Sequence, residues 1–174
     1  MPELISLVGG ECTGKSTLAD ALGRRLPAIV VSEFLREWVE RSGRVPLPAE
    51  QAAVMAEHRD AEVRALQQAD RSGLDWTVSD SGPLMTAVYS IQYYDDDSLL
   101  PQALEWTALS NTVVWCQDDF PWHPDPQRDG SHARKTSQQI LASIFAENPG
   151  LPMLRVRGPV HERAETVLRD TISR

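Results

Sequence analysis

Between two apolar stretches the chain reads Gly9-Gly10-Glu11-Cys12-Thr13-Gly14-Lys15-Ser16. This segment fits the spacing G-x-x-x-x-G-K-[ST] at every fixed position, which chance alone would produce in well under about 1% of chains of this length. Glycine allows the backbone to turn its N–H groups inward, where they can surround phosphate oxygens. The segment therefore predicts a loop that binds the phosphates of a nucleotide.

The ligands expected at this loop are ATP and Mg²⁺. Lys15 would reach the β- and γ-phosphates, the hydroxyl of Ser16 would ligate Mg²⁺, and the N-terminus of the following helix adds partial positive charge. The thiol of Cys12 has two interpretations: a small residue that fits the loop, or a redox-sensitive group near a helix N-terminus. The predicted nucleotide-binding residues are Gly10, Glu11, Cys12, Thr13, Gly14, Lys15, Ser16 and Thr17.

Strands and helices are expected to alternate along the chain. Short apolar runs predict strands at 4–8, 28–31, 76–80, 112–116 and 153–156, and helical periodicity predicts helices at 16–26, 34–41, 48–71, 82–94, 98–109, 131–147 and 160–173. Strands that are nearly all apolar, including the second, indicate a parallel sheet buried on both faces. We therefore expect the α/β class and the P-loop NTPase fold, with a five-stranded parallel sheet, a single domain over 1–174 and a lid segment at about 118–134.

Acidic residues stand at the ends of two predicted strands, where ligands of parallel sheets bind. Asp80 closes the strand at 76–80 and is the candidate to hold Mg²⁺, although it could instead cap the next helix. Glu33 follows the second strand and could accept a hydroxyl proton or bind ribose hydroxyls, while Arg36 could contact a phosphate. The alternative for this pair is an ordinary surface salt bridge. The residues alone leave open whether Glu33 or Asp80 is the general base.

A Pro-rich segment at 118–130 combines an aromatic ring, carboxylates and an arginine. Trp122 could stack on a flat, preferably cationic ring, and Asp119 or Asp125 could bind sugar hydroxyls. Arg128 could stabilise charge on the transferring phosphoryl group. A rigid surface loop without a ligand is the alternative.

The overall charge narrows the range of partners. The 174 residues include 25 acidic and 17 basic side chains, which gives a formal net charge of −8. Nucleic acids and anionic membranes require a positive field, so we expect neither as a partner, and a small-molecule acceptor instead. The two cysteines cannot form a disulfide framework, and no secretory or membrane-spanning segment is recognisable, which predicts a cytoplasmic protein. A homo-oligomer remains open.

The motifs in combination resemble those of the ribosylnicotinamide kinase family. The resemblance rests on the loop from Gly9 to Thr17, on Glu33-Phe34-Leu35-Arg36-Glu37 and on Asp80, in that order. The segment Asp119-x-Pro-Trp122-x-x-Asp125-x-x-Arg128 is similar to the substrate and lid segment of that family. The chain departs from the family pattern at Cys12, where serine is expected, and at Phe34-Leu35, where Tyr-Gly is expected.

This resemblance implies transfer of the γ-phosphate of ATP to the 5′-hydroxyl of nicotinamide riboside. Lys15, Ser16 and Thr17 would then hold ATP–Mg²⁺, and Arg128 would act from the lid. By analogy with P-loop kinases, Arg157 would lie near adenine. The alternatives are a kinase of another nucleoside or small metabolite, and a regulatory P-loop ATPase without a phosphate acceptor. The residues that the resemblance places on the acceptor side are Glu33, Arg36, Asp80, Trp122 and Asp125.

Overall fold

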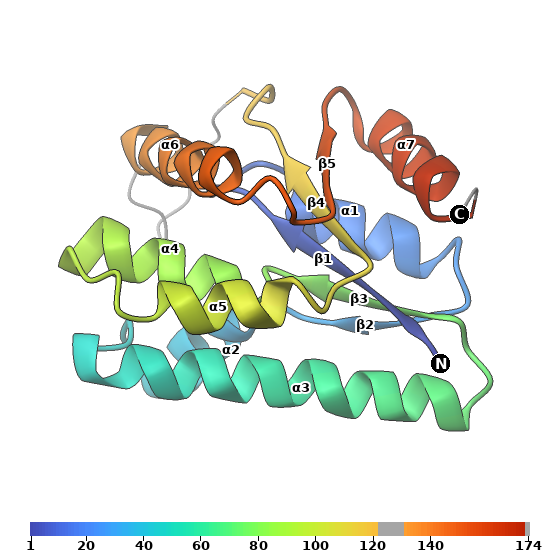
Figure 1. Ribbon diagram of the computed structural model, residues 1–174, viewed down its shortest axis with the longest axis horizontal. Helices are drawn as coiled ribbons and strands as arrows, with labels where there is room; N and C mark the ends of the chain where they lie inside the picture. Colours follow the sequence, from blue (N-terminus) through green and yellow to red (C-terminus); the bar gives the residue numbers. More distant parts are fainter. Residues whose placement is uncertain (122–130, 173–174) are drawn as a thin grey trace.

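Strand β1 (Glu3–Val8) runs through the centre of a five-stranded sheet with the order β2-β3-β1-β4-β5. In this computed structural model, which describes residues 1–121 and 131–172, every pair of neighbouring strands is parallel (Figure 1). The sheet thus has the expected α/β arrangement. The other strands are β2 (Ala28–Val31), β3 (Trp76–Asp80), β4 (Thr112–Cys116) and β5 (Met153–Val156).

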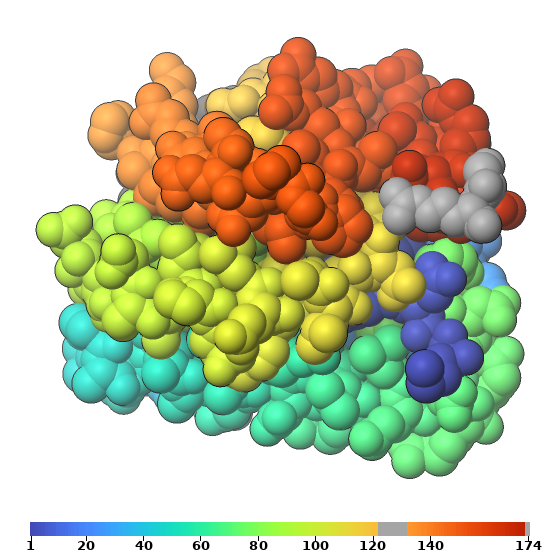
Figure 2. All heavy atoms as spheres, in the orientation of Figure 1, coloured from blue at the N-terminus to red at the C-terminus, as the bar shows by residue number. Residues whose placement is uncertain are grey.

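Helices cover both faces of this sheet. Helices α1 (Lys15–Gly23) and α7 (Val160–Ile172) pack on one face. Figure 2 shows much of the other side, where α3 (Gln51–Arg71), α4 (Pro83–Tyr94), α5 (Leu100–Thr107) and α6 (Ser131–Glu147) lie. Helix α2 (Phe34–Ser42) and a 3₁₀ turn (Pro48–Glu50) contact α3. The expected P-loop NTPase fold is therefore confirmed.

Side chains of the central strands alternate between two apolar cores. Ile5 and Leu7 face α1 and α7, whereas Val8 faces the core formed with α4, α5 and α6. A strand with helices on both sides buries both of its faces, which explains why β1 has no polar face. Within the described residues, no helix is both long and apolar enough to span a bilayer.

The second strand differs from its prediction. Strand β2 was expected to be buried, but none of its residues is buried and Val30 is 39% exposed. Its position explains this, because β2 is an edge strand that pairs only with β3. An apolar run indicates a strand but does not reveal whether a second neighbour will cover it. The helix predicted at 16–26 also ends earlier, at Gly23, and is followed by a turn before Pro27.

This strand order determines where the predicted residues meet. The loop after β1 is flanked by the carboxyl ends of β3 and β4, and β2 lies beyond β3. Asp80 at the end of β3 is in register with Leu7, close to the point where β1 gives way to the phosphate loop. Residues that are distant in sequence therefore converge at the carboxyl end of the parallel strands.

Candidate active site

The phosphate loop joins β1 to α1 and depends on glycines with unusual backbone angles. Gly9 has a φ of 151°, and Gly14, the N-cap of α1, is left-handed with a φ of 79°. A Cβ added at Gly9 would lie 2.7 Å from Thr13 Oγ1 and 2.8 Å from the carbonyl oxygen of Cys116. Only glycine fits such a position without displacing the backbone around it. The local fold that the motif predicts is present.

Lys15 lies inside this loop. Its side chain is 7% exposed, and its Nζ donates hydrogen bonds to the carbonyl oxygens of Gly9 at 2.8 Å and Gly10 at 3.0 Å. The ammonium group is therefore held at the centre of the turn, where a phosphate chain would need a positive charge. Cys12, also in the loop, is left-handed and partly buried, and both interpretations of its thiol stay open.

Asp80 lies beside the start of α1. Its carboxyl group is buried, and burial raises its pKa, while the positive charge of Lys15 and a hydrogen bond from Ser16 oppose that rise. A carboxylate and a hydroxyl are hard oxygen donors of the kind that Mg²⁺ prefers. The described residues contain no group of three His, Cys, Asp or Glu side chains able to hold a metal ion. The pair fits Mg²⁺, because that ion commonly keeps several waters and takes few protein ligands.

Glu33 and Arg36 stand next to this group at the end of β2. Glu33 is the N-cap residue of α2, and its carboxylate lies 3.6 Å from Arg36 Nη2. The charges of both side chains act on the pKa of Asp80, as that of Lys15 does. The structure therefore brings the predicted phosphate-side and acceptor-side residues of β1, β2 and β3 together.

Tyr89 of α4 faces the same region and was not anticipated from the sequence. Its ring is buried, and its pKa is raised well above the usual value, first by burial and then by the negative charges of Glu33, Glu11 and Asp80. A phenol beside carboxylates can donate a hydrogen bond while staying neutral. Nothing in the sequence distinguishes Tyr89 from the other aromatic residues of its helix, so only the fold identifies it.

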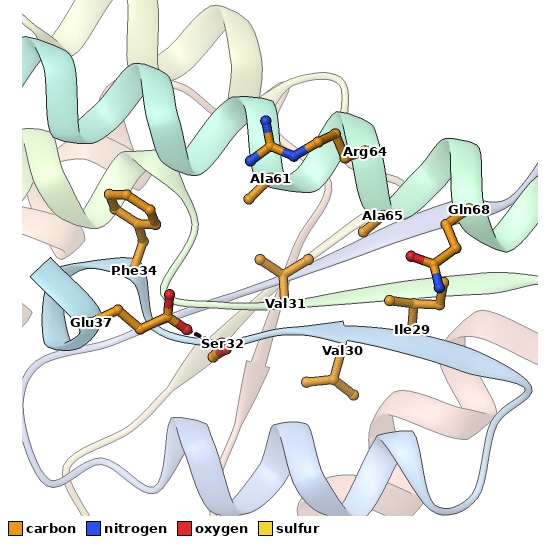
Figure 3. Close-up of a pocket in the computed structure, with 10 residues that line it drawn as sticks. All are labelled: Ile29, Val30, Val31, Ser32, Phe34, Glu37, Ala61, Arg64, Ala65 and Gln68. Carbon is orange, nitrogen blue, oxygen red and sulfur yellow. Dashed lines mark hydrogen bonds between the residues drawn. The ribbon is translucent and has the colours of Figure 1, made fainter.

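A hollow of about 230 Å³ lies along the open edge of the sheet, outside the phosphate loop (Figure 3). It is lined by apolar side chains of β2 and α3, with Phe34 and Glu37 from α2 and Arg64 from α3. Glu37 accepts a hydrogen bond from Ser32 at 2.7 Å. None of the residues of the phosphate loop lines this hollow, so we do not assign it to the nucleotide.

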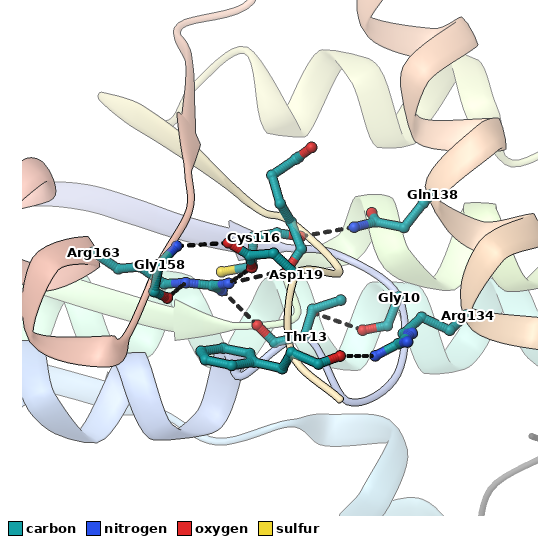
Figure 4. A network of polar contacts seen from close by, with 10 residues as sticks. Gly10, Thr13, Cys116, Asp119, Arg134, Gln138, Gly158 and Arg163 are labelled. Carbon is teal, nitrogen blue, oxygen red and sulfur yellow. Dashed lines mark hydrogen bonds and ion pairs between the residues drawn. The ribbon is translucent and has the colours of Figure 1, made fainter. Parts of the chain in front are cut away.

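Arg163 of α7 forms the centre of a polar network on the other side of the phosphate loop (Figure 4). It is 1% exposed and donates to the carbonyl oxygens of Thr13, Gln117 and Gly158. It also forms an ion pair with Asp119, whose second oxygen accepts a hydrogen bond from Gly158 N at 2.6 Å. No sequence motif predicted this role for Arg163.

The network also places two of the predicted residues. Asp119 follows β4, whereas Glu33 follows β2 and Asp80 is the last residue of β3, both on the opposite side of β1. A contact between Asp119 and the acceptor stays a prediction. Arg157 is exposed in the loop after β5, next to Gly158. Trp122, Asp125 and Arg128 lie outside the described residues.

Comparison with known proteins agrees with this fold. The sequence profile of a family described as an AAA domain matches residues 4–163. The solved structure of NadR protein in complex with NR has a TM-score of 0.78 at 18% identity, over 97% of this chain and 50% of that one. NadR in complex with NAD and AMP-PNP gives a TM-score of 0.76 at 18% identity, over 97% and 49%. This chain therefore spans about half the length of those proteins.

Two further proteins are similar to this chain, one over its whole length and the other over a small part. A deoxyadenosine kinase from M. mycoides, with products bound, has a TM-score of 0.63 at 15% identity over 98% of this chain and 100% of that one. The 5-methyl-1-naphthoate synthase of Streptomyces sahachiroi is 34% identical over 115 residues, which are 60% of this chain and 6% of that protein. The solved structures share the fold of P-loop nucleoside kinases with this chain.

Proposed function

The chain belongs to the AAA-domain family, and from that membership and its site we propose that it is an ATP-dependent kinase of a small nucleoside, with nicotinamide riboside as the first candidate acceptor. One observation carries the proposal. The charge of Lys15, inside the phosphate loop, acts on the pKa of Asp80, and so do the charges of Glu33 and Arg36 at the next strand end. In this proposal a nucleotide-binding half and an acceptor half would adjoin at the carboxyl end of the sheet.

On the nucleotide side, the phosphate loop and Lys15 would hold the phosphates of ATP. Ser16 and Asp80 would hold Mg²⁺, which when bound neutralises charge on the phosphate oxygens. We assign Asp80 to this side because Lys15 and Ser16 both act to lower the pKa of its carboxyl group. Arg157 would lie near adenine, and Arg128 would act on the transferring phosphoryl group.

On the acceptor side, Glu33 would accept the proton of the 5′-hydroxyl as that oxygen attacks the γ-phosphorus and ADP departs. Its side chain is 18% exposed and lies 3.6 Å from Arg36, whereas Asp80 is buried beside Lys15, which favours Glu33 over Asp80 as the base. Phosphoryl transfer through a loose transition state depends chiefly on positioning and charge neutralisation. Trp122 and Asp125 would complete the acceptor site.

The charge of Glu33 is compatible with a nucleoside as acceptor. Glu33 is the carboxylate that we assign to the acceptor side, and its charge acts on the pKa of both Tyr89 and Asp80. A carboxylate at this position favours an acceptor that offers hydroxyl groups or a cationic ring. A protein of the same fold binds NR, which agrees with nicotinamide riboside as the first candidate.

The proposal is tested by incubating the protein with ATP, Mg²⁺ and one acceptor at a time, and measuring ADP and the phosphorylated product. Nicotinamide riboside, deoxyadenosine, thymidine and cytidine form the panel, and a reaction without acceptor is the control. Product from nicotinamide riboside supports the proposal in full. Product only from another nucleoside removes the proposed acceptor, and product from none contradicts the kinase assignment.

The AAA-domain match favours one competing function, a regulatory ATPase without a phosphate acceptor. The same reactions distinguish the two. An ATPase would release ADP at one rate whether or not a nucleoside is present, whereas a kinase would release it mainly with its acceptor and in equal amount with product.

A further inference from the structure

Arg163 is the largest fully buried side chain of the described residues. Burying a guanidinium group costs several kcal/mol unless it is paired and its N–H groups are hydrogen-bonded. All three nitrogens of Arg163 have acceptors, and one of those acceptors is in the phosphate loop. The cost is thus offset only when the loops around Arg163 are in their observed positions.

Three loops meet at this guanidinium. Nη1 donates to the carbonyl oxygen of Thr13 at 2.6 Å and Nε to that of Gly158 at 2.7 Å (Figure 4). Nη2 donates to the carbonyl oxygen of Gln117 at 3.1 Å. These residues lie in the phosphate loop, after β5 and after β4, respectively. Arg163 therefore fixes the phosphate loop relative to the two loops beside it.

The contact with Thr13 has a directional consequence. A trans peptide points its C=O and N–H in opposite directions, and the structure has no cis bonds in the described residues. Because Arg163 holds the carbonyl oxygen of Thr13, the N–H of Gly14 points away from Arg163. A fixed direction for this N–H group is what a phosphate-binding loop requires.

Phe120, in the loop after β4, also belongs to the network. Its ring lies 4.3 Å from the Arg163 guanidinium carbon, centroid to Cζ, and 3.0 Å from the position of a Cβ on Gly14. Its carbonyl oxygen accepts a hydrogen bond from Arg134 Nη1 at 3.0 Å. The backbone of Arg134 in turn packs on Gly10. The described residues on both sides of 122–130 thus contact the phosphate loop.

We propose that Arg163 is a positioning residue that holds the phosphate loop in its nucleotide-binding form and, with Phe120, joins it to the loop that follows β4. The proposal rests on the proposed function in one respect, the identity of ATP as the nucleotide. It needs no particular acceptor. Asp119 takes part as the counter-charge that keeps the guanidinium in place.

The test compares Arg163→Lys with Arg169→Lys, an exposed arginine of the same helix that serves as matched control. Calorimetry gives the Kd of each protein for Mg²⁺–ATP and for inorganic tripolyphosphate, without any acceptor. Loss of charged hydrogen bonds should raise the Kd of both ligands about tenfold in Arg163→Lys. The Kd values of the control should stay within about twofold of wild type. Unchanged binding of both ligands would overturn the proposal. If Arg163→Lys weakened the binding of ATP but not of tripolyphosphate, Arg163 would position the loop of Gly158 and not the phosphate loop. That result would also overturn the proposal.

A second variant covers the case in which Arg163→Lys does not fold, which circular dichroism would show. Phe120→Leu retains every hydrogen bond of Arg163 and removes the ring between it and Gly14. This variant should raise the Kd for tripolyphosphate about threefold. Wild-type affinity in the folded variant would contradict the proposal. In a kinase assay, the folded variants should raise the KM for ATP and leave the acceptor KM within about twofold. Equal increases in both KM values would indicate a merely structural role. Because binding is measured without acceptor, a negative acceptor panel would not obscure this result.

Discussion

The ammonium nitrogen of Lys15 lies 2.8 Å from the carbonyl oxygen of Gly9, the first residue of its own loop. The side chain therefore folds back over the turn that precedes it instead of extending into solvent. Lys135, the other lysine of the chain, is exposed on α6. The two lysines thus offer a matched pair for a test of the nucleotide site.

Replacing Lys15 by alanine should raise the Kd of Mg²⁺–ATP about 100-fold and abolish measurable phosphoryl transfer, because a buried charge at the phosphates is lost. Lys135→Ala should behave as wild type. Calorimetry measures the first effect and product formation the second. Equal losses in both variants would show that overall charge, and not the position of Lys15, governs binding.

Glu33→Gln and Asp80→Asn should separate the two carboxylates. Glu33→Gln should lower kcat about 100-fold and leave the Kd of Mg²⁺–ATP unchanged, because only the general base is lost. Asp80→Asn should raise the Mg²⁺ concentration needed for half-maximal ATP binding. The assignment is reversed if Asp80→Asn alters only kcat while Glu33→Gln alters the Mg²⁺ requirement.

Gly9→Ala should disrupt the phosphate loop, since its Cβ would meet Thr13 Oγ1 and the Cys116 carbonyl at 2.7 and 2.8 Å. Strain of about 1–3 kcal/mol is expected at its φ of 151°, with a corresponding loss of ATP affinity. Gly150→Ala is the control, because no heavy atom lies within 4 Å of its added Cβ. Urea unfolding and calorimetry of both variants check the prediction, which a Gly9→Ala protein of wild-type affinity would refute.

His58 should make the protein less stable in mild acid. It is 2% exposed, its Nε2 lies 3.1 Å from Ser79 Oγ, and burial lowers its pKa from 6.5 to about 4. The unfolded chain binds a proton here below pH 6.5, but the folded chain does so only near pH 4. The free energy of unfolding should therefore fall by about 2 kcal/mol from this group between pH 7 and pH 5.

The comparison for His58 is His58→Gln, which can still hydrogen-bond to Ser79 but does not titrate. Glu62, one turn along α3, has a raised pKa from burial and titrates in both proteins, so the difference isolates the imidazole. Urea midpoints at pH 7 and pH 5 give the two slopes. A His58→Gln protein that loses as much stability as wild type would disprove the role of His58.

Trp122→Ala tests the acceptor side that was inferred from the sequence alone. If the indole stacks on a flat ring, the acceptor KM should rise about tenfold while the KM for ATP changes little. Steady-state kinetics with each substrate varied in turn measures both values. Equal changes in the two KM values would count against stacking.

Much of the fold could be predicted because its signals are local. The glycine spacing of residues 9–16 requires a strand before it and a helix after it, and short apolar runs located each of the five strands. The same signals could not rank the strands in space. Strand β2 is as apolar as β1, yet Val30 is 39% exposed, because only one strand pairs with β2.

Some residues of the candidate site could also be identified from local sequence signals, whereas others could not. The sequence by itself determined the phosphate loop and named Lys15, Ser16, Glu33 and Asp80, because fixed spacing and strand ends carry that information. The tertiary structure alone decided that Tyr89 faces those carboxylates and that Arg163 reaches Thr13 across 150 positions. Such contacts have no local signature, since a buried arginine on an amphipathic helix looks like a surface residue until the loops that accept its hydrogen bonds fold around it.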